Sequence, residues 1–187
     1  LSCSSGEENM ALRSELTELL RALRREMREK FCRRVSTGDL LSNRWETARD
    51  LGFGEGTSCY DNVLVLGEVR VGKHTWIGPN VILDGSGGPL TIGDYCSISA
   101  GVQIYTHSSV QWATSLGKAD KESAPTTLGS GVYLGPGTIV QMGVEIGDRT
   151  IVGALSVVNR SLPSGVKAWG TPARIQSPGG GEPAQSL

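Results

Sequence analysis

The sequence predicts a mainly β chain, a parallel β-helix of six-residue repeats preceded by an N-terminal α-helical segment. Two features of residues 63–175 indicate the β-helix: an aliphatic residue recurs every six positions, and glycine is frequent, with 26 residues in a chain of 187. Only 5% of the residues are aromatic. Because glycine costs about 1 kcal/mol at each helical position, this composition disfavours a helical bundle.

The six-residue pattern occupies thirteen positions, and all of them are Ile, Leu or Val. They are Val65, Val71, Ile77, Leu83, Ile92, Ile98, Ile104, Leu128, Leu134, Val140, Ile146, Val152 and Val158, with a three-residue slip before Ile92 and a long interruption before Leu128. Each unit is expected to form one short strand and one turn, with its aliphatic residue pointing inward. Three units would close a triangular coil, and stacked coils would bury the aliphatic residues in one core.

Glycine follows the aliphatic residue in seven of the repeats, which predicts turns that are tight or left-handed at that point. The seven glycines are Gly72, Gly78, Gly93, Gly129, Gly135, Gly147 and Gly153. An ordinary β-sandwich is the alternative fold. It is disfavoured because sandwich strands recur at intervals of about 8–12 residues.

Residues 10–35 carry apolar side chains at intervals of three and four, which predicts an amphipathic helix that ends at Ser36–Gly38. A shorter helix is expected around Trp45–Leu51. The first helix is expected to pack on the β-helix or on a partner subunit; docking on a membrane surface is the alternative. The chain therefore divides into 1–9, a disordered lead or expression remnant; 10–62, a helical segment and loop; 63–175, the β-helix, with a loop at 108–127; and 176–187, a disordered tail.

Charge and cysteine content exclude several functional classes. The formal net charge is −1, so no overall basic field indicates nucleic acid or anionic membrane as a partner. No apolar run approaches the ~18 residues that span a bilayer. The four cysteines include no C-x-x-C pair, which indicates neither a zinc cage nor a disulfide framework. We expect a cytoplasmic protein with reduced thiols.

Five stretches are more specific than the repeat itself: 44–49 (RWETAR), 52–57 (GFGEGT), 83–88 (LDGSGG), 98–107 (ISAGVQIYTH) and 170–174 (GTPAR). Together with the repeats they resemble the hexapeptide-repeat acyltransferases, and within them sugar O-acetyltransferases of bacterial surface-polysaccharide gene clusters. The resemblance covers about residues 45–175. It implies a left-handed coil, a homotrimer with active sites between subunits, acetyl-coenzyme A as co-substrate and a carbohydrate as acceptor, with no metal.

Only two histidines occur in the chain, His74 and His107. His107 immediately precedes the interruption at 108–127, and long loops in regular folds usually carry function. The resemblance assigns His107 as the general base that takes the acceptor proton, a task that suits imidazole because its ordinary pKa lies near physiological pH. Asp84 lies one coil earlier, where other repeats have glycine. It is expected to orient this imidazole, to contact the acceptor, or only to cap the turn at Gly85–Gly88.

The resemblance also indicates where the cofactor and the acceptor bind. Tyr105 and Trp112 are candidates for an apolar platform under a sugar ring, or else anchors of the loop. Two substitutions, Leu155 and Thr171, depart from the family pattern. The expected coenzyme A contacts, with positive charge for the phosphates, are Gly135, Gly153, Ala154, Lys167, Thr171, Pro172 and Arg174.

Three alternative functions remain open from the sequence. An N-acetyltransferase acting on an amino sugar would use the same histidine, and a non-catalytic β-helix scaffold would use none. A zinc-dependent hydratase of the same fold would need three protein ligands, and His74 is expected only as an exposed polar residue. A covalent acyl-enzyme is disfavoured because Cys96 lies at an inward position and Cys59 has no histidine near it in sequence.

Overall fold

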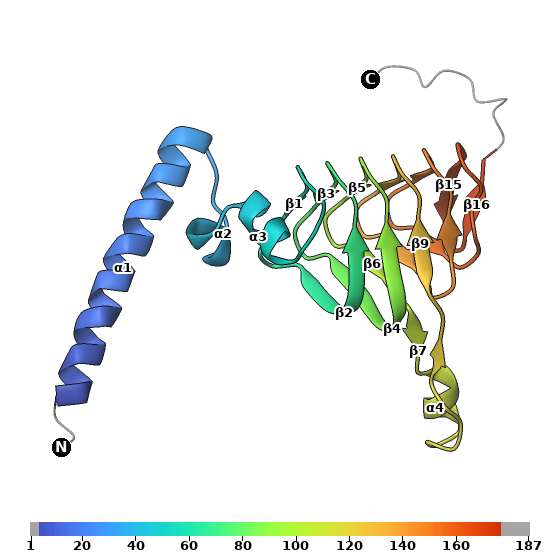
Figure 1. Cartoon of the computed structure of the whole chain (residues 1–187), viewed down its shortest axis with the longest axis horizontal. Helices are drawn as coiled ribbons and strands as arrows, with labels where there is room; N and C mark the ends of the chain where they lie inside the picture. Colours follow the sequence, from blue (N-terminus) through green and yellow to red (C-terminus); the bar gives the residue numbers. More distant parts are fainter. Residues whose placement is uncertain (1–3, 177–187) are drawn as a thin grey trace.

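The computed structural model describes residues 4–176, with side chains described from Glu8 onward. Figure 1 shows a stack of β coils, a long helix α1 standing away from it at one end, and an arm that carries α4. The helices are α1 (Ser4–Phe31), α2 (Gly38–Leu41), α3 (Arg44–Asp50) and α4 (Val110–Thr114). None of the helices in the described part of the chain is long and apolar enough to cross a membrane.

Sixteen mostly short strands build the stack and the arm, and all pairs are parallel except β7–β8 and β15–β16. The strands are β1 (Ser58–Cys59), β2 (Leu64–Val71), β3 (Trp76–Ile77), β4 (Ile82–Ile92), β5 (Ser97–Ile98), β6 (Gln103–Ile104), β7 (His107–Ser108), β8 (Glu122–Ser123), β9 (Thr126–Leu128), β10 (Tyr133–Leu134), β11 (Ile139–Val140), β12 (Glu145–Ile146), β13 (Ile151–Val152), β14 (Val157–Val158), β15 (Lys167–Gly170) and β16 (Ala173–Ile175).

The parallel strands form the three faces of a prism, as the six-residue pattern predicts. The first face stacks β1, β3, β5, β10, β13 and β15. The second stacks the beginnings of β2 and β4 with β6, β11 and β14, and the third stacks the ends of β2 and β4 with β9 and β12. Because β2 and β4 each turn a corner, they belong to two faces at once.

The core consists of the predicted aliphatic residues. Twelve of the thirteen are buried, and Val65, in the first coil, is partly buried. Each face contributes one ladder: Leu134, for example, lies between Ile98 and Val152 in the register of the first face. The predicted inward frame is therefore confirmed, and the parallel β-helix with it.

The glycines of the repeats serve close packing rather than left-handed turns. A Cβ on Gly135 would lie 2.5 Å from the backbone nitrogen of Ala154 in the next coil, a separation that real contacts do not allow. The left-handed residue comes two positions later, as at Gly137 with φ of +70°. Non-glycine residues also occupy this turn position, among them Leu155 with φ of +56°.

The N-terminal segment differs from the prediction at both ends. The first helix begins at Ser4, so residues 4–9 are helical rather than disordered, and it ends at Phe31 instead of Ser36. Cys32 adopts φ of +50°, and the Arg33 amide donates back to the Met27 carbonyl, which terminates the helix. In one chain α1 contacts α2 and does not lie on the β-helix (Figure 1). Residues 1–3 and 177–187 lie outside the described residues.

The shorter helix is present as α3, and Asn43 and Glu46 form a capping box at its start. The β-helix begins earlier than predicted, because β1 at Ser58–Cys59 already pairs with β3. The interruption at 108–127 is not a loop without structure. It is an arm in which β7 and β8 pair antiparallel and enclose α4 (Figure 1).

Candidate active site

Asp84 and His107 meet at one corner of the prism. The Asp84 Oδ2 atom lies 3.0 Å from the His107 Nδ1 atom, with the carboxylate side chain 3% exposed and the imidazole 32% exposed. The second carboxylate oxygen accepts hydrogen bonds from the Ser86 amide at 2.9 Å and the Ser86 hydroxyl at 2.5 Å. Both carboxylate oxygens are therefore satisfied, and the pair is held from the buried side.

Thr106 fixes the backbone on both sides of this pair. Its hydroxyl donates to the Asp84 carbonyl at 2.8 Å and accepts from the Gly87 amide at 3.0 Å. Its own carbonyl accepts from the Ala124 amide at 2.9 Å, where the arm returns to the prism. His107 thus begins the arm at a point that neighbouring coils hold in place, although its ring remains partly open to solvent.

This geometry gives the two ring nitrogens different tasks. A carboxylate only accepts hydrogen bonds, so the proton lies on Nδ1 and the lone pair on Nε2. An imidazole oriented in this way can take a proton from a hydroxyl placed at Nε2. The arrangement is that of a base and its positioning carboxylate. The sequence named both residues but not Ser86 or Thr106; the signal for Ser86 was its place two residues after Asp84, the spacing of an Asx turn.

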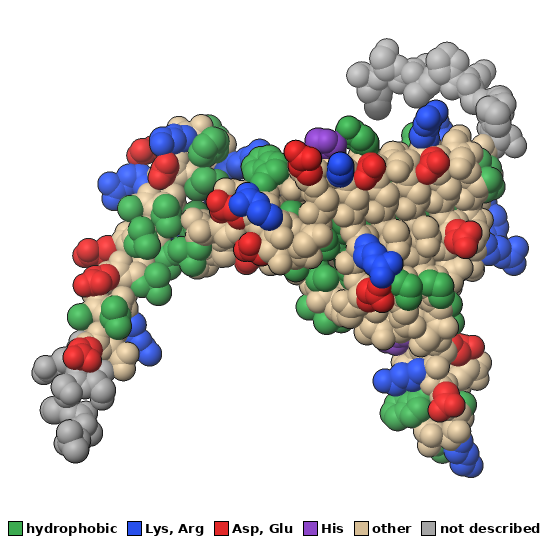
Figure 2. All heavy atoms as spheres, viewed as in Figure 1, with side chains coloured by type: hydrophobic (Ala, Val, Ile, Leu, Met, Phe, Trp, Pro, Cys, Tyr) green, Lys and Arg blue, Asp and Glu red, His purple; other side chains and the backbone are tan. Residues whose placement is uncertain are grey.

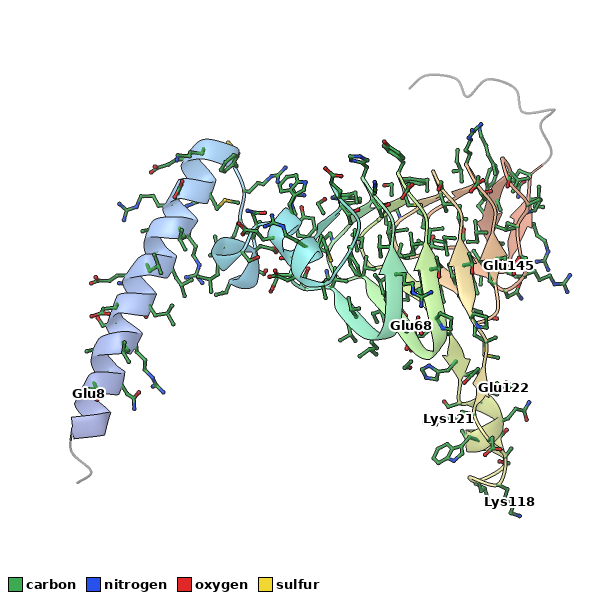
Figure 3. The ribbon with its side chains drawn as sticks, in the orientation of Figure 1. Glu8, Glu68, Lys118, Lys121, Glu122 and Glu145 are labelled. Carbon is green, nitrogen blue, oxygen red and sulfur yellow. The ribbon has the colours of Figure 1, made fainter. Side chains whose placement is uncertain are left out.

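The structure does not bring the two predicted platform residues into one surface. Trp112 lies on α4 in the arm, 48% exposed, and the Lys121 Nζ atom lies 5.9 Å from its ring centroid. Tyr105 is half-buried on the prism, and its hydroxyl donates to Gln103 Oε1 at 2.7 Å. In Figure 3, Lys118 lies at the tip of the arm and Lys121 between the tip and the prism. Trp112 is the more exposed of the two.

Three of the seven predicted coenzyme A residues, Gly135, Gly153 and Ala154, lie at a different corner. This corner is made of residues 135–138 and 153–156 and is called here the Gly135 corner. Gly135 is buried and packs on Gly153 and Ala154, whereas Ala154 is exposed. The exposed Thr171 closes the end of this corner, since its hydroxyl donates to the Leu155 carbonyl at 3.3 Å. Pro172 follows it, also exposed.

Two predicted phosphate-binding cations occupy the last strands. Lys167 begins β15, and Arg174 lies on β16, where it is opposite Trp169 in the antiparallel register. Both are exposed. They belong to the same end of the prism as Thr171, which suits a cofactor that runs from the Gly135 corner to the end of the β-helix.

The Asp84–His107 pair and the Gly135 corner lie at opposite edges of the second face. Strands β6, β11 and β14 run from the Gly135 corner toward the corner that holds His107. The outward residues that immediately precede the core residues of this face are Leu64, Ile82, Gln103, Ile139 and Val157, apolar except for Gln103. A single chain therefore presents His107 and the predicted cofactor residues on two edges of one apolar surface.

The other histidine has no such environment. His74 is exposed and left-handed, with φ of +53°, and its ring stacks on Tyr95 with centroids 4.9 Å apart. In residues 8–176 no three His, Cys, Asp or Glu side chains are grouped as metal ligands. His74 is part of an exposed aromatic stack in the turns of the first two coils.

The cysteines of the prism are buried, and we expect them to resist thiol reagents. Burial raises the pKa of the Cys59 thiol to about 12 and also raises the pKa of Cys96, so little reactive thiolate forms near neutral pH. Iodoacetamide followed by peptide mass spectrometry should label the exposed Cys32 and leave Cys59 and Cys96 unmodified until denaturant is added. Labelling of Cys59 in the native protein would contradict its place in the core.

Comparison with known proteins agrees with the fold. Residues 125–160 match the family model described as bacterial transferase hexapeptide (six repeats). An Escherichia coli protein that is named as a colanic acid biosynthesis acetyltransferase is 34% identical to this chain over 123 residues. The match covers 57% of this chain and 67% of that protein. The chain belongs to the hexapeptide-repeat acyltransferases.

Galactoside O-acetyltransferase of E. coli is 29% identical over 107 residues, 57% of this chain and 42% of that protein. The match thus spans less than half of that relative's length. A crystal structure of a hexapeptide-repeat acetyltransferase from Vibrio cholerae superposes with a TM-score of 0.64 and 29% identity, covering 91% of this chain and 92% of the other. A second structure of that protein contains acetyl-coenzyme A, with the same TM-score and identity and coverage of 91% and 88%.

Proposed function

We propose that this protein is a coenzyme A-dependent O-acetyltransferase that transfers the acetyl group of acetyl-coenzyme A to a hydroxyl of a sugar or a similar small molecule. The observation that carries the proposal is the His107 imidazole, fixed through Nδ1 by a buried carboxylate and open toward solvent at the base of an arm. The acetyl-coenzyme A complex of the V. cholerae relative and the galactoside substrate named for the E. coli relative support the choice of donor and acceptor.

In the proposed reaction His107 Nε2 takes the proton of the acceptor hydroxyl while that oxygen attacks the carbonyl carbon of the thioester. The carbon–sulfur bond then breaks, and the imidazolium returns the proton to the leaving thiolate. Asp84 stabilises the positive charge on the ring and holds its orientation. Transfer is direct, because the buried cysteines of the prism carry raised pKa values and offer no thiolate nucleophile.

We further propose that the enzyme is a homotrimer whose sites lie between subunits. The apolar second face separates His107 from the Gly135 corner within one chain, so it is the surface that a neighbouring copy would cover. Rotational symmetry would then place the Gly135 corner of one subunit beside His107 of the next. Gly153, Ala154 and Thr171 would line the cofactor arm, and Lys167 and Arg174 would pair with its phosphates.

The proposal is tested by assaying thiol release from acetyl-coenzyme A with monosaccharides, nucleotide sugars and matched amino sugars as acceptors. We expect turnover with a hydroxyl acceptor and its loss when that hydroxyl is replaced by hydrogen. Transfer only to amino sugars would assign N-acetyl transfer instead. No turnover with any acceptor, by a protein that sediments as a trimer, would favour a scaffold.

Asp84→Asn should impair turnover while leaving the fold and cofactor binding intact. The asparagine amide would donate to His107 Nδ1, forcing the ring proton onto Nε2 and removing the lone pair that takes the acceptor proton. We expect kcat to fall by about 10²-fold or more. Steady-state kinetics would measure this, with Kd for acetyl-coenzyme A and Tm as controls. A variant with wild-type kcat would mean that Asp84 only caps the turn at Ser86.

A further inference from the structure

Helix α1 has an apolar stripe that its own chain leaves largely uncovered. An α-helix turns about 100° per residue, which places six apolar residues on one stripe. Leu12, Leu16 and Leu19 are 62%, 49% and 50% exposed. Figure 2 shows hydrophobic side chains along the side of α1 that faces the gap between this helix and the β-helix. The stripe consists of Leu12, Leu16, Leu19, Leu20, Leu23 and Met27.

A helix of 28 residues with an exposed apolar stripe needs a partner surface to cover that stripe. Helices in proteins are stabilised mainly by packing of their apolar face, and isolated ones are only marginally stable in water. Residues 32–37, which join α1 to α2, form neither helix nor strand. The body of the chain therefore leaves the first half of the stripe, from Leu12 to Leu19, without a covering surface.

The charges beside the stripe are sorted by sign, except for Lys30, which lies among the acidic residues and pairs with Glu26. On one side lie the basic residues Arg13 and Arg24, with Arg28 further round, and these form the basic flank. On the other side lie Glu8 and Glu15, with Glu26 and Glu29, which form the acidic flank. Glu18, Arg21 and Arg25 lie on the opposite side of the helix. Within residues 8–176 the only ion pair of α1 is Lys30–Glu26 at 2.7 Å.

This separation of basic and acidic residues favours a second copy of α1 as the partner, and it favours a parallel direction of the two helices. When two identical helices run parallel about a rotation axis, the basic flank of one meets the acidic flank of the next. When they run antiparallel, each flank meets its own kind, and like charges repel. We propose that α1 associates with α1 of other copies of this chain in a parallel bundle, which covers the apolar stripe and pairs the arginines with glutamates. That the bundle has three helices rests on the proposed homotrimer, whereas the parallel pairing does not depend on acyl transfer.

Cross-linking at single cysteines tests the proposal in the full chain. In a Cys3→Ser, Cys32→Ser background, Leu12→Cys places a thiol on the stripe, far from the midpoint of the six apolar residues. A parallel bundle brings this residue beside itself in the next copy, so mild oxidation should give covalent dimers on a non-reducing gel. In an antiparallel pair it would instead lie opposite a residue near Met27.

Ser14→Cys in the same background is the control, because this residue points away from the stripe and should give no dimer above random collision. Adding Arg13→Glu, Arg24→Glu and Arg28→Glu to Leu12→Cys makes both flanks acidic and should abolish the dimer. Equal cross-linking at residues 12 and 14, or none at residue 12, would overturn the proposal. An oligomer that sediments normally without cross-linking at residue 12 would place the stripe on a neighbour's β-helix. Acetyl transfer, assayed separately, tests the proposed function.

Discussion

Replacing His107 by alanine is expected to lower kcat by about 10²–10⁴-fold, the usual contribution of a positioned general base. The affinity for acetyl-coenzyme A should hardly change, because the proposed cofactor contacts come from the Gly135 corner and the last strands, whereas His107 is proposed to contact the acceptor hydroxyl. Steady-state kinetics with saturating acceptor, together with calorimetric titration of the cofactor, would measure both quantities. A loss confined to turnover separates a base from a residue that shapes the site, which would affect binding and turnover together.

His74→Ala is the matched control for this experiment. It removes the only other histidine of the chain, from an exposed turn where the ring stacks on Tyr95, and should keep wild-type turnover. A correctly assembled His107→Ala protein that retained more than about a tenth of wild-type kcat would fall well short of the loss expected for a base. The proposed mechanism would then be wrong, and the carboxylate of Asp84 would become the candidate base.

Leu134→Asp is expected to unfold the β-helix. Leu134 is fully buried and lies between Ile98 and Val152 in adjacent coils, so a carboxylate there would have no partner. Burying an unpaired charge costs several kcal/mol even after the structure relaxes. Since domains are stable by only about 5–15 kcal/mol, thermal denaturation followed by circular dichroism should show a large fall in Tm or no folded protein.

Tyr133→Asp makes the same chemical change one residue earlier on the same strand. Tyr133 points outward and is 40% exposed, so this variant should melt close to the wild type. The contrast between neighbouring residues tests the inward frame itself. If Leu134→Asp melted within a degree or two of Tyr133→Asp, the six-residue frame would be misassigned by one position.

The aliphatic core residues of the β-helix could be predicted from sequence, because each repeat supplies its own core residue. Each repeat must place one aliphatic residue in the core, so the pattern survives even where Leu83 and Ile92 are separated by nine positions. The start of the β-helix was missed because Phe53 and Cys59 continue the same frame but are not Ile, Leu or Val. Both are buried, and cysteine is among the most buried residue types. The sequence therefore contained the information needed to predict the earlier start of the β-helix.

The N-terminal helix was predicted in kind but not in extent. Its apolar periodicity continues through Phe31 to Val35, and nothing in that pattern reveals that Cys32 turns left-handed and ends the helix. Boundaries depend on a few backbone hydrogen bonds, such as the one from Arg33 to Met27, and these leave little trace in residue type.

For the candidate site, the sequence determined which residues are available: two histidines, one acidic residue in a glycine position, and a long excursion after His107. It also determined which residue of each repeat is buried, because a six-residue unit carries that information within itself. The roles of the cofactor and acceptor residues remain predictions.

Only the tertiary structure decided that Asp84 meets Nδ1 of His107, and that His107 and the Gly135 corner lie at opposite edges of one face. These relations depend on how successive coils stack and where β4 turns its corner. Twenty or more residues separate the groups along the chain, and the register that brings them together or keeps them apart is set by contacts between repeats, which no single repeat contains.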